Sequence, residues 1–317
     1  MTAPALHDPA PSDLLPRGLA LADFLAGSWG KEIVHGRSDS KAVGLLDVPA
    51  LEEVLRYNVL RFPYVFMSKD RARLPVEKYC SNRRVFSYQQ EGYLDGEKAV
   101  AALAGGASLY LNHLEDWHPA FGRYLDSWHP LPVAKVVANA FVTPAGTQAV
   151  GRHWDDSHNF ILQTAGSKRW RIYAPPAAPH PDMTAEDLKT ELLLDTVLEP
   201  GDVIYFPPAF PHEAEGSDGL SVHLTFAAYE IMPTLVLQSL VPALDTVQSW
   251  KRLDPHLLDP RARAEQSMSL IREAMEAIGP DPVVEAWGGR RKQVSLASLT
   301  GDFSATSSQG PAGGTRG

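Results

Sequence analysis

Residues 151–173 read GRHWDDSHNFILQTAGSKRWRIY and place an imidazole and a carboxylate, His153 and Asp155, just before the apolar run at 160–162. Side chains two positions apart on an extended chain point to the same face, so His153 and Asp155 share a face and Asp156 takes the other. One histidine and one carboxylate are two thirds of the facial triad that holds non-haem Fe(II) in oxygenases. The stretch therefore predicts a metal site that needs a second histidine.

The second histidine is predicted in residues 199–216, which read EPGDVIYFPPAFPHEAEG. Here a turn, an apolar strand and a Pro-rich loop precede His212, an arrangement that brings a second sheet edge across the mouth of a β-barrel. His158 and His223 are alternatives. His158 lies five positions from His153 and so on the opposite face of a regular strand, and His223 is interpreted as a residue that lines the pocket. Zn²⁺ also accepts two histidines and one carboxylate, so this pattern alone leaves the metal open.

The chain after Val133 consists of short apolar runs separated by turn signals at 143–146, 164–166 and 199–202. Short strands punctuated by Gly and Pro are typical of a β-sandwich or β-barrel. The mouth of such a fold is a natural cavity for a metal and a small ligand.

Helices are expected to flank this β-rich part. Apolar spacing predicts them over 19–29, 48–55, 97–103 and 121–128. Strands are predicted over 61–68 and 108–111. In the first of these, alternation puts the three aromatic side chains on one face, where they are predicted to be core: Phe62, Tyr64 and Phe66.

Composition restricts the class of protein. The 317 residues contain 44% hydrophobic residues, as is ordinary for a globular protein, and one cysteine, Cys80, which excludes an intramolecular disulfide and fits a cytoplasmic location. No apolar run is long enough to span a bilayer, and residues 1–13 lack the features of a secretory signal. The formal charge of −9 argues against a general nucleic-acid binder, although a local basic patch is compatible with that total. No sequence-specific nucleic-acid binding and no membrane association are expected.

Three segments resemble the JmjC-type cupin proteins known as ribosomal oxygenases: residues 138–173, 200–216 and 221–230, the last reading SVHLTFAAYE. The resemblance is strong over 109–230 and weaker before it, where DFLAGSWGKEIVHGR is similar to the opening helix of the family. It implies a mainly β fold with flanking helices, built on a double-stranded β-helix (jelly-roll) core. It also implies a protein hydroxylase that depends on Fe(II) and 2-oxoglutarate.

The resemblance also implies site residues. Fe(II) would be held by His153, Asp155 and His212. Lys168 occupies the position of the basic residue that binds the far carboxylate of 2-oxoglutarate, and strand alternation favours it over Arg169 and Arg171, which take the other face. Asn139 and Thr225 match polar positions near the co-substrate. Tyr110 and Asn112 are expected on the substrate side of the mouth.

The favoured substrate implied by the resemblance is an Arg or His side chain of a ribosomal protein. The region after 232 departs from the family, whose C-terminal winged-helix module needs more chain, so two alternatives stay open. One is an oxygenase acting on a free amino acid, a small peptide or a natural-product intermediate. The other is a non-catalytic cupin that binds a metal. Lys168 argues against this alternative, because a binding module needs no cation for a co-substrate.

Four parts are predicted along the chain: a disordered N-terminus (1–17), a JmjC/cupin domain (18–231), a helical region (232–303) and a disordered tail (304–317). The helical region contains an apolar stripe at 4,3,4,3 spacing, made of Ala264, Met268, Ile271, Met275 and Ile278. The resembled family dimerises through helices at this place, so a homodimer is expected.

Overall fold

The computed structural model describes residues 11–57, 59–128, 131, 133–148, 150–180, 183–184, 186–230, 236–238, 240–241 and 259–281. The chain divides into two compact units, Met1–Leu235 and Val236–Gly317. Residues 11–14 form a 3₁₀-helix (η1, Pro11–Leu14) in which Leu14 is buried. The predicted disorder of the N-terminus therefore does not extend to these residues. Residues 1–10 and the predicted tail, 304–317, lie outside the described residues.

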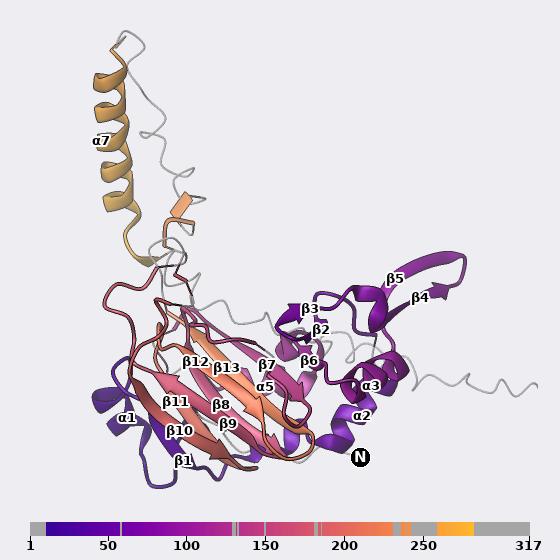
Figure 1. Cartoon of the computed structure of the whole chain (residues 1–317). Coiled ribbons are helices and arrows are strands. Elements are labelled where there is room, and N and C mark those ends of the chain that lie inside the picture. The colour runs from indigo at the N-terminus through magenta and orange to yellow at the C-terminus, as the bar shows by residue number, and fades with distance from the viewer. Residues whose placement is uncertain are drawn as a thin grey trace, which may run out of the picture. The chain divides into compact units, whose positions relative to one another are not determined.

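The first unit contains two facing antiparallel sheets (Figure 1). The large sheet has eight strands in the order β1 (Val34–Arg37), β11 (Asp202–Phe206), β8 (His158–Ala165), β13 (Ser221–Tyr229), β7 (Lys135–Thr143), β6 (Ser108–Leu111), β2 (Val65–Lys69) and β3 (Ala72–Arg73). The small sheet has the order β10 (Leu192–Leu198), β9 (Lys168–Tyr173) and β12 (His212–Gly216). A separate hairpin consists of β4 (Cys80–Val85) and β5 (Tyr88–Leu94). This is the predicted jelly-roll.

Helices lie before and between the strands of this unit. They are α1 (Leu21–Gly27), α2 (Val48–Tyr57), α3 (Gly96–Ala104), α4 (Leu114–Trp117) and α5 (Pro119–Asp126), with two further 3₁₀-helices, η2 (Lys41–Leu45) and η3 (Val76–Lys78). The four predicted helices are confirmed with small shifts at their ends. Asp95 begins α3 because its side chain accepts a hydrogen bond from the Lys98 N–H.

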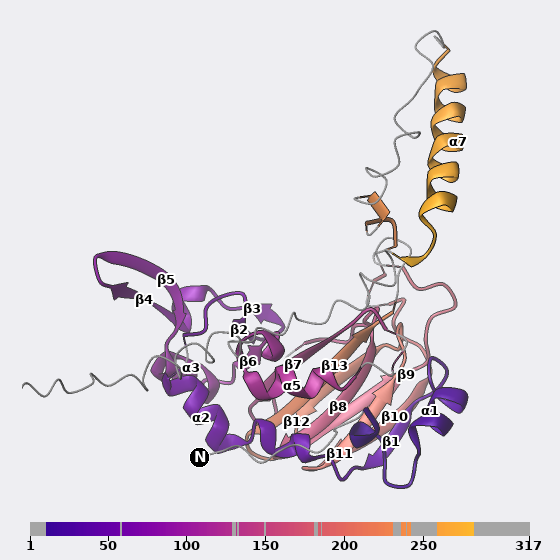
Figure 2. The same ribbon diagram turned by 180° about the vertical axis from the view of Figure 1, so that it is seen from behind.

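The central strands β8 and β13 of the large sheet are buried on both faces, and the side chains of β8 alternate between two hydrophobic clusters. In β8, Phe160 and Leu162 pack with the helices, including Phe24 of α1 and Phe121 of α5, and Figure 2 shows α5 in front of this face. Ile161 points the other way, toward the small sheet, into a second cluster. The face between the sheets is the one that carries the candidate site.

The β8–β9 turn sets which side chains of β9 point inward. Gly166 adopts a φ of +58°, and a Cβ at this position would collide with the carbonyl oxygen of Leu220, so only glycine fits. β9 then alternates, with Lys168 buried and Arg169 exposed. The face assignment made from the sequence is confirmed.

The prediction for residues 61–68 is partly wrong. The strand begins at Val65, because residues 62–64 form a turn that contains a cis bond before Pro63. Phe66 is partly buried, but Phe62 and Tyr64 are 41% and 39% exposed and are not core. Alternation assigns a face to a side chain and does not show whether other residues cover that face.

The second unit is described mainly through α7 (Pro260–Ile278), which contains the predicted apolar stripe. Met268 is 64% exposed in the described structure, and Ile271 and Met275 are also exposed. Most of the region 232–303 lies outside the described residues, so its predicted boundaries stay a prediction. In the part of the chain that is described, no helix combines the length and the apolar character that crossing a membrane requires.

Candidate metal and co-substrate site

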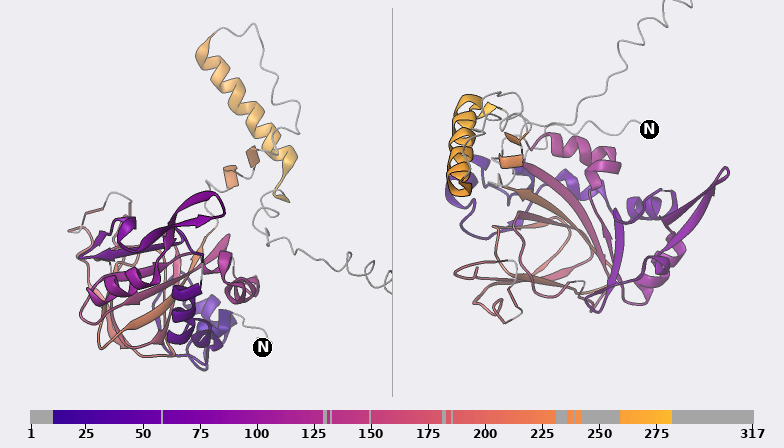
Figure 3. Two further views of the ribbon diagram at one scale, coloured as in Figure 1. Left: turned by 90° about the vertical axis from the view of Figure 1, so that its right-hand side faces the viewer. Right: turned by 90° about the horizontal axis from the view of Figure 1, so that it is seen from above.

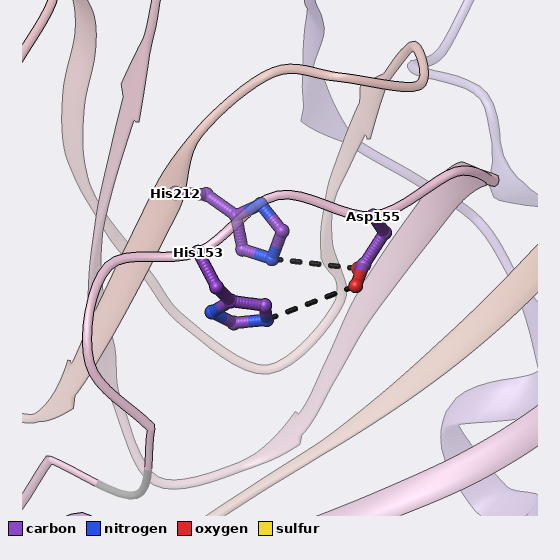
Figure 4. Close-up of side chains that lie close together, drawn as sticks. All are labelled: His153, Asp155 and His212. Carbon is purple, nitrogen blue, oxygen red and sulfur yellow. Dashed lines mark ion pairs between the residues drawn. The ribbon is translucent and has the colours of Figure 1, made fainter. Parts of the chain in front are cut away.

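Three predicted metal ligands lie close together, as Figure 4 shows. The Nε2 atoms of His153 and His212 lie 3.9 and 3.6 Å from the two carboxylate oxygens of Asp155. One possible ligand atom of each residue lies within 4.8 Å of the others. Asp156 is exposed and outside this group, as the face argument predicted.

Backbone pairing brings the ligands together. His153 lies in an isolated bridge with His212, in which each N–H donates to the other residue's carbonyl oxygen at 3.1 and 2.8 Å. Asp155 lies in the loop that leads into β8, and its carbonyl oxygen accepts from the Ala209 N–H at 2.8 Å. The loop that carries two ligands is therefore bonded to the segment that carries the third.

Hydrogen bonds fix the tautomer of both histidines. His153 Nδ1 lies 2.9 Å from the Gly151 carbonyl oxygen, and His212 Nδ1 lies 3.0 Å from that of Phe210. A carbonyl oxygen only accepts, so each Nδ1 carries the proton and each neutral ring keeps its lone pair on Nε2. Both lone pairs are then available to a metal on the side of Asp155.

Burial and charge favour the ligand form of these groups. Desolvation, with the neighbouring His153, lowers the pKa of His212 to about 4, so its ring is neutral at pH 7. Asp155 Oδ2 accepts a hydrogen bond from the Asn159 side-chain amide at 3.1 Å, and Asn159 is buried. This contact orients the carboxylate.

Lys168 lies 1% exposed in the same cavity as the three ligands. Its Nζ donates to Thr143 Oγ1 at 2.8 Å and lies 3.3 Å from His223 Nδ1. Both partners are uncharged groups, and within the described residues no carboxylate pairs with this ammonium. Burial lowers the pKa of Lys168 to about 7. A buried cation without a counter-ion is energetically costly, and an anion bound beside it would reduce that cost.

His223 completes this end of the cavity. Its ring stacks on Phe141, with centroids 4.7 Å apart and planes 3° from parallel. A charged Lys168 can only donate to Nδ1, so the His223 proton lies on Nε2. His223 is therefore confirmed as a residue that lines the pocket.

The two other residues predicted near the co-substrate differ in whether they line the cavity. Thr225 lines the cavity. Asn139 lies opposite Thr225 in the β7–β13 register and shares the face of Phe141, but its Oδ1 accepts from the His113 N–H at 3.1 Å. Asn139 is not among the residues that line the cavity, so the structure assigns it a contact with the β6–α4 connection.

The substrate-side candidates and the alternative ligand have structural partners. Tyr110 is 3% exposed and shares a hydrogen bond with the Ser68 hydroxyl, and Asn112 donates to the Pro63 carbonyl oxygen at 2.9 Å. His158 is fully buried away from the metal ligands. Its Nδ1 lies 2.9 Å from the Tyr205 hydroxyl, its Nε2 lies 2.7 Å from Glu230, and its ring stacks on Trp29.

Two residues of the site were not predicted, namely Thr143 and Asn159. Thr143 falls on the inner face of β7, two positions from Phe141, so period-2 alternation could have identified it. Asn159 contacts Asp155 only because the loop before β8 turns back, and the sequence contains no signal for that.

The JmjC domain family matches residues 120–233. Human ribosomal oxygenase 1 is 42% identical over 217 residues, which are 65% of this chain and 32% of that protein. Rat ribosomal oxygenase 1 is 31% identical over the same length, 65% of this chain and 35% of that protein. The chain thus spans about a third of the length of these curated relatives.

Solved structures of Escherichia coli ycfD share the fold. One has a TM-score of 0.59 at 20% identity and covers 87% of this chain and 74% of that chain. Another, a ribosomal oxygenase in complex with cobalt and 2-oxoglutarate, has a TM-score of 0.57 at 20% identity and covers 86% and 70%. With the facing sheets and the His-Asp-His group, these matches show that the chain contains a JmjC domain similar to that of the ribosomal oxygenases.

Proposed function

We propose that the protein is an Fe(II)- and 2-oxoglutarate-dependent oxygenase that hydroxylates an amino-acid side chain. The observation that carries the proposal is the buried Lys168, which has no carboxylate partner among the described residues and lies in the same cavity as His153, Asp155 and His212. A site that only binds a metal needs the three ligands. The buried ammonium adds a site for the far carboxylate of an anionic co-substrate.

The donor set fits Fe(II). Two neutral imidazole nitrogens and one carboxylate on one side of a metal leave its other positions open, which suits a chelating 2-oxo acid and dioxygen. Tetrahedral Zn²⁺ with two histidines and one carboxylate is the competing arrangement. Lys168 favours the iron assignment, since Zn²⁺ hydrolases need no cation for a dicarboxylate.

Bound iron would supply the oxidation of 2-oxoglutarate by dioxygen, coupled to oxidation of a substrate C–H bond. The residues of the chain would bind and orient. Lys168 and Thr143 would hold the far carboxylate, and His223 would present its Nε2–H to the same cavity. The aromatic walls, Trp170 and Phe206, would exclude water from it.

The proposed substrate is an Arg or His side chain of a ribosomal protein. The names of the relatives, ribosomal oxygenases 1 and 2, support the ribosomal part of this proposal, and the residue type follows the resemblance described for the sequence. A structural feature also supports a large substrate: the side chains of His153 and Asp155 are 38% and 39% exposed, so a side chain presented on a protein could reach the metal. A free amino acid, a small peptide or a natural-product intermediate is the second class to test.

The first experiment is an anaerobic titration of the protein with Fe(II) and then 2-oxoglutarate, followed in the visible range. Chelation of iron by the 2-oxo acid is expected to give a weak metal-to-ligand charge-transfer band, and His153→Ala should abolish it together with metal binding. Metal binding without a band in the unmodified protein would refute the oxygenase assignment and favour the metal-binding cupin.

The substrate is tested separately. Incubation with ribosomal proteins, iron, 2-oxoglutarate and oxygen is expected to add one oxygen atom to a single peptide, detected by mass spectrometry. Asp155→Asn serves as the inactive control. Modification of free amino acids or short peptides alone would move the substrate to the small-molecule class.

A homodimer formed through α7 and a cytoplasmic location remain part of the proposal. The exposed stripe of Met268, Ile271 and Met275 supports self-association, since exposed apolar patches mark interaction sites. Light scattering is expected to give a dimer mass, and joint replacement of Met268 and Ile271 by serine should yield a monomer. A monomer mass at every concentration of the unmodified chain would exclude the dimer.

A further inference from the structure

We propose that the β4–β5 hairpin is a binding arm for single-stranded RNA. The hairpin arm is defined as residues Cys80–Leu94, that is β4, β5 and the turn between them. RNA binding here is a function beyond the proposed oxygenase activity. It can be tested without iron, co-substrate or turnover, so its failure and that of the proposed function are distinguishable.

The hairpin arm projects away from the two facing sheets (Figure 1 and Figure 3). Its two strands form their own sheet and pair with neither of the other two. Every residue from Asn82 to Gln89 is exposed. An isolated two-stranded hairpin is only marginally stable in water, so its outer part contributes little to the stability of the domain.

The tip of the arm carries an aromatic side chain in a conformation that aromatic residues rarely adopt. Phe86 has a φ of +53° and is 93% exposed. Glycine or asparagine is usual at such turn positions, and a bulky residue there is strained. Phe86 therefore adds strain without adding packing, and Tyr88 beside it is 70% exposed. A contact outside the chain would explain both residues.

The exposed aromatic side chains of this protein are concentrated around the arm. Among the described residues, all the exposed aromatic side chains lie between positions 57 and 88: Tyr57, Phe62, Tyr64, Phe86 and Tyr88. Scattered exposed apolar residues are normal, whereas a set confined to one segment marks an interaction site.

The same segment is basic in an acidic protein. Residues 56–98 contain nine Lys or Arg and five Asp or Glu, a formal charge of +4, whereas the whole chain has −9 and the remainder therefore −13. Between Asn82 and Gln90 the arm has two arginines and no acidic residue. A polyanion is therefore attracted to this segment and repelled by the remainder.

Three arginines of the segment are available to phosphates. Arg61 and Arg83 lie over the Tyr93 ring, each with its guanidinium carbon 5.1 Å from the ring centre. Arg84 donates to the Phe86 carbonyl oxygen at 3.2 Å, which braces the turn. Within the described part of the chain none of the three pairs with a carboxylate, whereas Arg152 and Arg169 do.

Exposed aromatic rings beside arginines that form no ion pair among the described residues are a combination suited to single-stranded nucleic acid, through base stacking and phosphate contacts. A second copy of the chain is a poorer occupant. The two aromatic side chains at the tip bury about 300–500 Å², below the roughly 800 Å² that each partner buries in a stable interface. Stacking on any base needs no sequence preference, so an RNA-binding arm agrees with the expectation of no sequence-specific binding.

The experiment measures the affinity of the full chain for a labelled single-stranded RNA of about 12 nucleotides by fluorescence anisotropy over a range of salt concentrations. Phe86→Ala with Tyr88→Ala is expected to weaken binding about tenfold or more, since each stacked base contributes strongly. Arg83→Gln with Arg84→Gln is expected to lower the slope of log K against log salt by about 1.4, because the variant can no longer neutralise two phosphates.

The matched control is Leu193→Ala with Val197→Ala, a pair of exposed apolar residues on β10 that should leave RNA affinity unchanged. Melting curves and 2-oxoglutarate binding of all variants should match the unmodified chain. The inference is wrong if the unmodified chain shows no salt-dependent binding, or if removal of the aromatic pair leaves the affinity unchanged. It is also wrong if that pair affects only modification of an RNA-free protein substrate, or only self-association.

Discussion

Replacing Lys168 by methionine is expected to abolish co-substrate binding and at the same time to stabilise the protein. Methionine has nearly the length of the lysine stem and no charge, so it fills the position without requiring a counter-ion. Each effect has its own assay. Together they separate a binding cation from a structural one, because a structural lysine would be needed for stability.

The size of the expected stability gain follows from the burial of the Lys168 ammonium. Burial lowers the pKa of Lys168 to about 7 from its ordinary value of 10.5. At 1.36 kcal/mol for each pKa unit, the charged form is therefore disfavoured by about 5 kcal/mol in the folded protein. Replacing a buried ion pair by apolar residues of similar volume is often neutral or stabilises by about 1–4 kcal/mol, and a gain within this range is expected for Lys168→Met. For a domain of this size that raises Tm by about 2–4 °C for each kcal/mol.

The stability that Lys168→Met gains over the unmodified protein depends on pH. The unfolded lysine keeps its proton up to pH 10.5, whereas the folded one loses it near pH 7. Between these values the unfolded state binds more protons, so the stability of the unmodified protein rises with pH. The advantage of Lys168→Met is therefore largest below pH 7 and shrinks as the pH approaches 10.5.

Two measurements test this prediction. Calorimetric titration with 2-oxoglutarate at saturating metal should show a loss of at least about a hundredfold in affinity, because breaking a buried charge pair costs about 3–5 kcal/mol. Thermal unfolding without ligand should show the higher Tm. The metal affinity should be unchanged, since no ligand atom is altered. A variant that is less stable than the unmodified protein, or that binds 2-oxoglutarate normally, would refute the reasoning.

Three further predictions concern the same domain. The affinity of the unmodified protein for 2-oxoglutarate should fall by up to about tenfold for each pH unit above 7, measured by calorimetry, because the neutral Lys168 must first be protonated; a flat profile from pH 7 to 9 would contradict this. Asn159→Leu should weaken metal binding by about 10–100-fold, measured by competition with a chelator, since Asp155 loses its orienting donor. His158→Phe should lower the free energy of urea unfolding by about 1–3 kcal/mol with unchanged metal affinity, because the buried Tyr205 hydroxyl loses the acceptor of its proton and, among the described residues, keeps only the Gly30 N–H as a partner.

The grouping of the three candidate metal ligands could be predicted from the sequence because each has a local signal. His153 and Asp155 are two positions apart in an extended segment, and His212 follows a strand and a Pro-rich loop. The resemblance to a known family added Lys168, and strand alternation correctly separated it from Arg169 and Arg171. These inferences need only local geometry and the pattern of one family.

The remaining contacts depend on how distant strands meet. Thr143 reaches Lys168 because β7 of the large sheet faces β9 of the small one, and the separation of 25 positions along the chain contains no trace of this. Asn139 shares the face of Thr143, yet its side chain is taken up by the His113 backbone. Period-2 alternation places both residues on the inner face and cannot say which of them contacts Lys168.

The errors at Phe62 and Tyr64 have the same origin. Alternation predicted that they share a face with Phe66, and apolar character suggested that the face is covered. The turn before Val65 removes both residues from the strand and leaves them exposed. A run of aromatic residues is predicted to be core because aromatic side chains in folded proteins are usually buried. Exposed aromatic side chains can be recognised as candidate contact residues only once the fold is known.

On the face between the sheets, the polar groups that the proposed function needs lower the stability of the fold. β13 reads SVHLTFAAY, in which Val222, Leu224 and Phe226 pack with the helices while His223 and Thr225 point into the cavity. A solvent-exposed surface accommodates polar side chains at little cost, but β13 is buried on both faces. Placing the imidazole and hydroxyl of β13 and the Lys168 ammonium of β9 in this buried region lowers stability unless each finds a partner. Thr143 and His223 satisfy Lys168 only as neutral acceptors, which leaves its charge uncompensated until an anion binds. The domain is therefore expected to be more stable with its co-substrate than without it, and this difference should disappear in Lys168→Met.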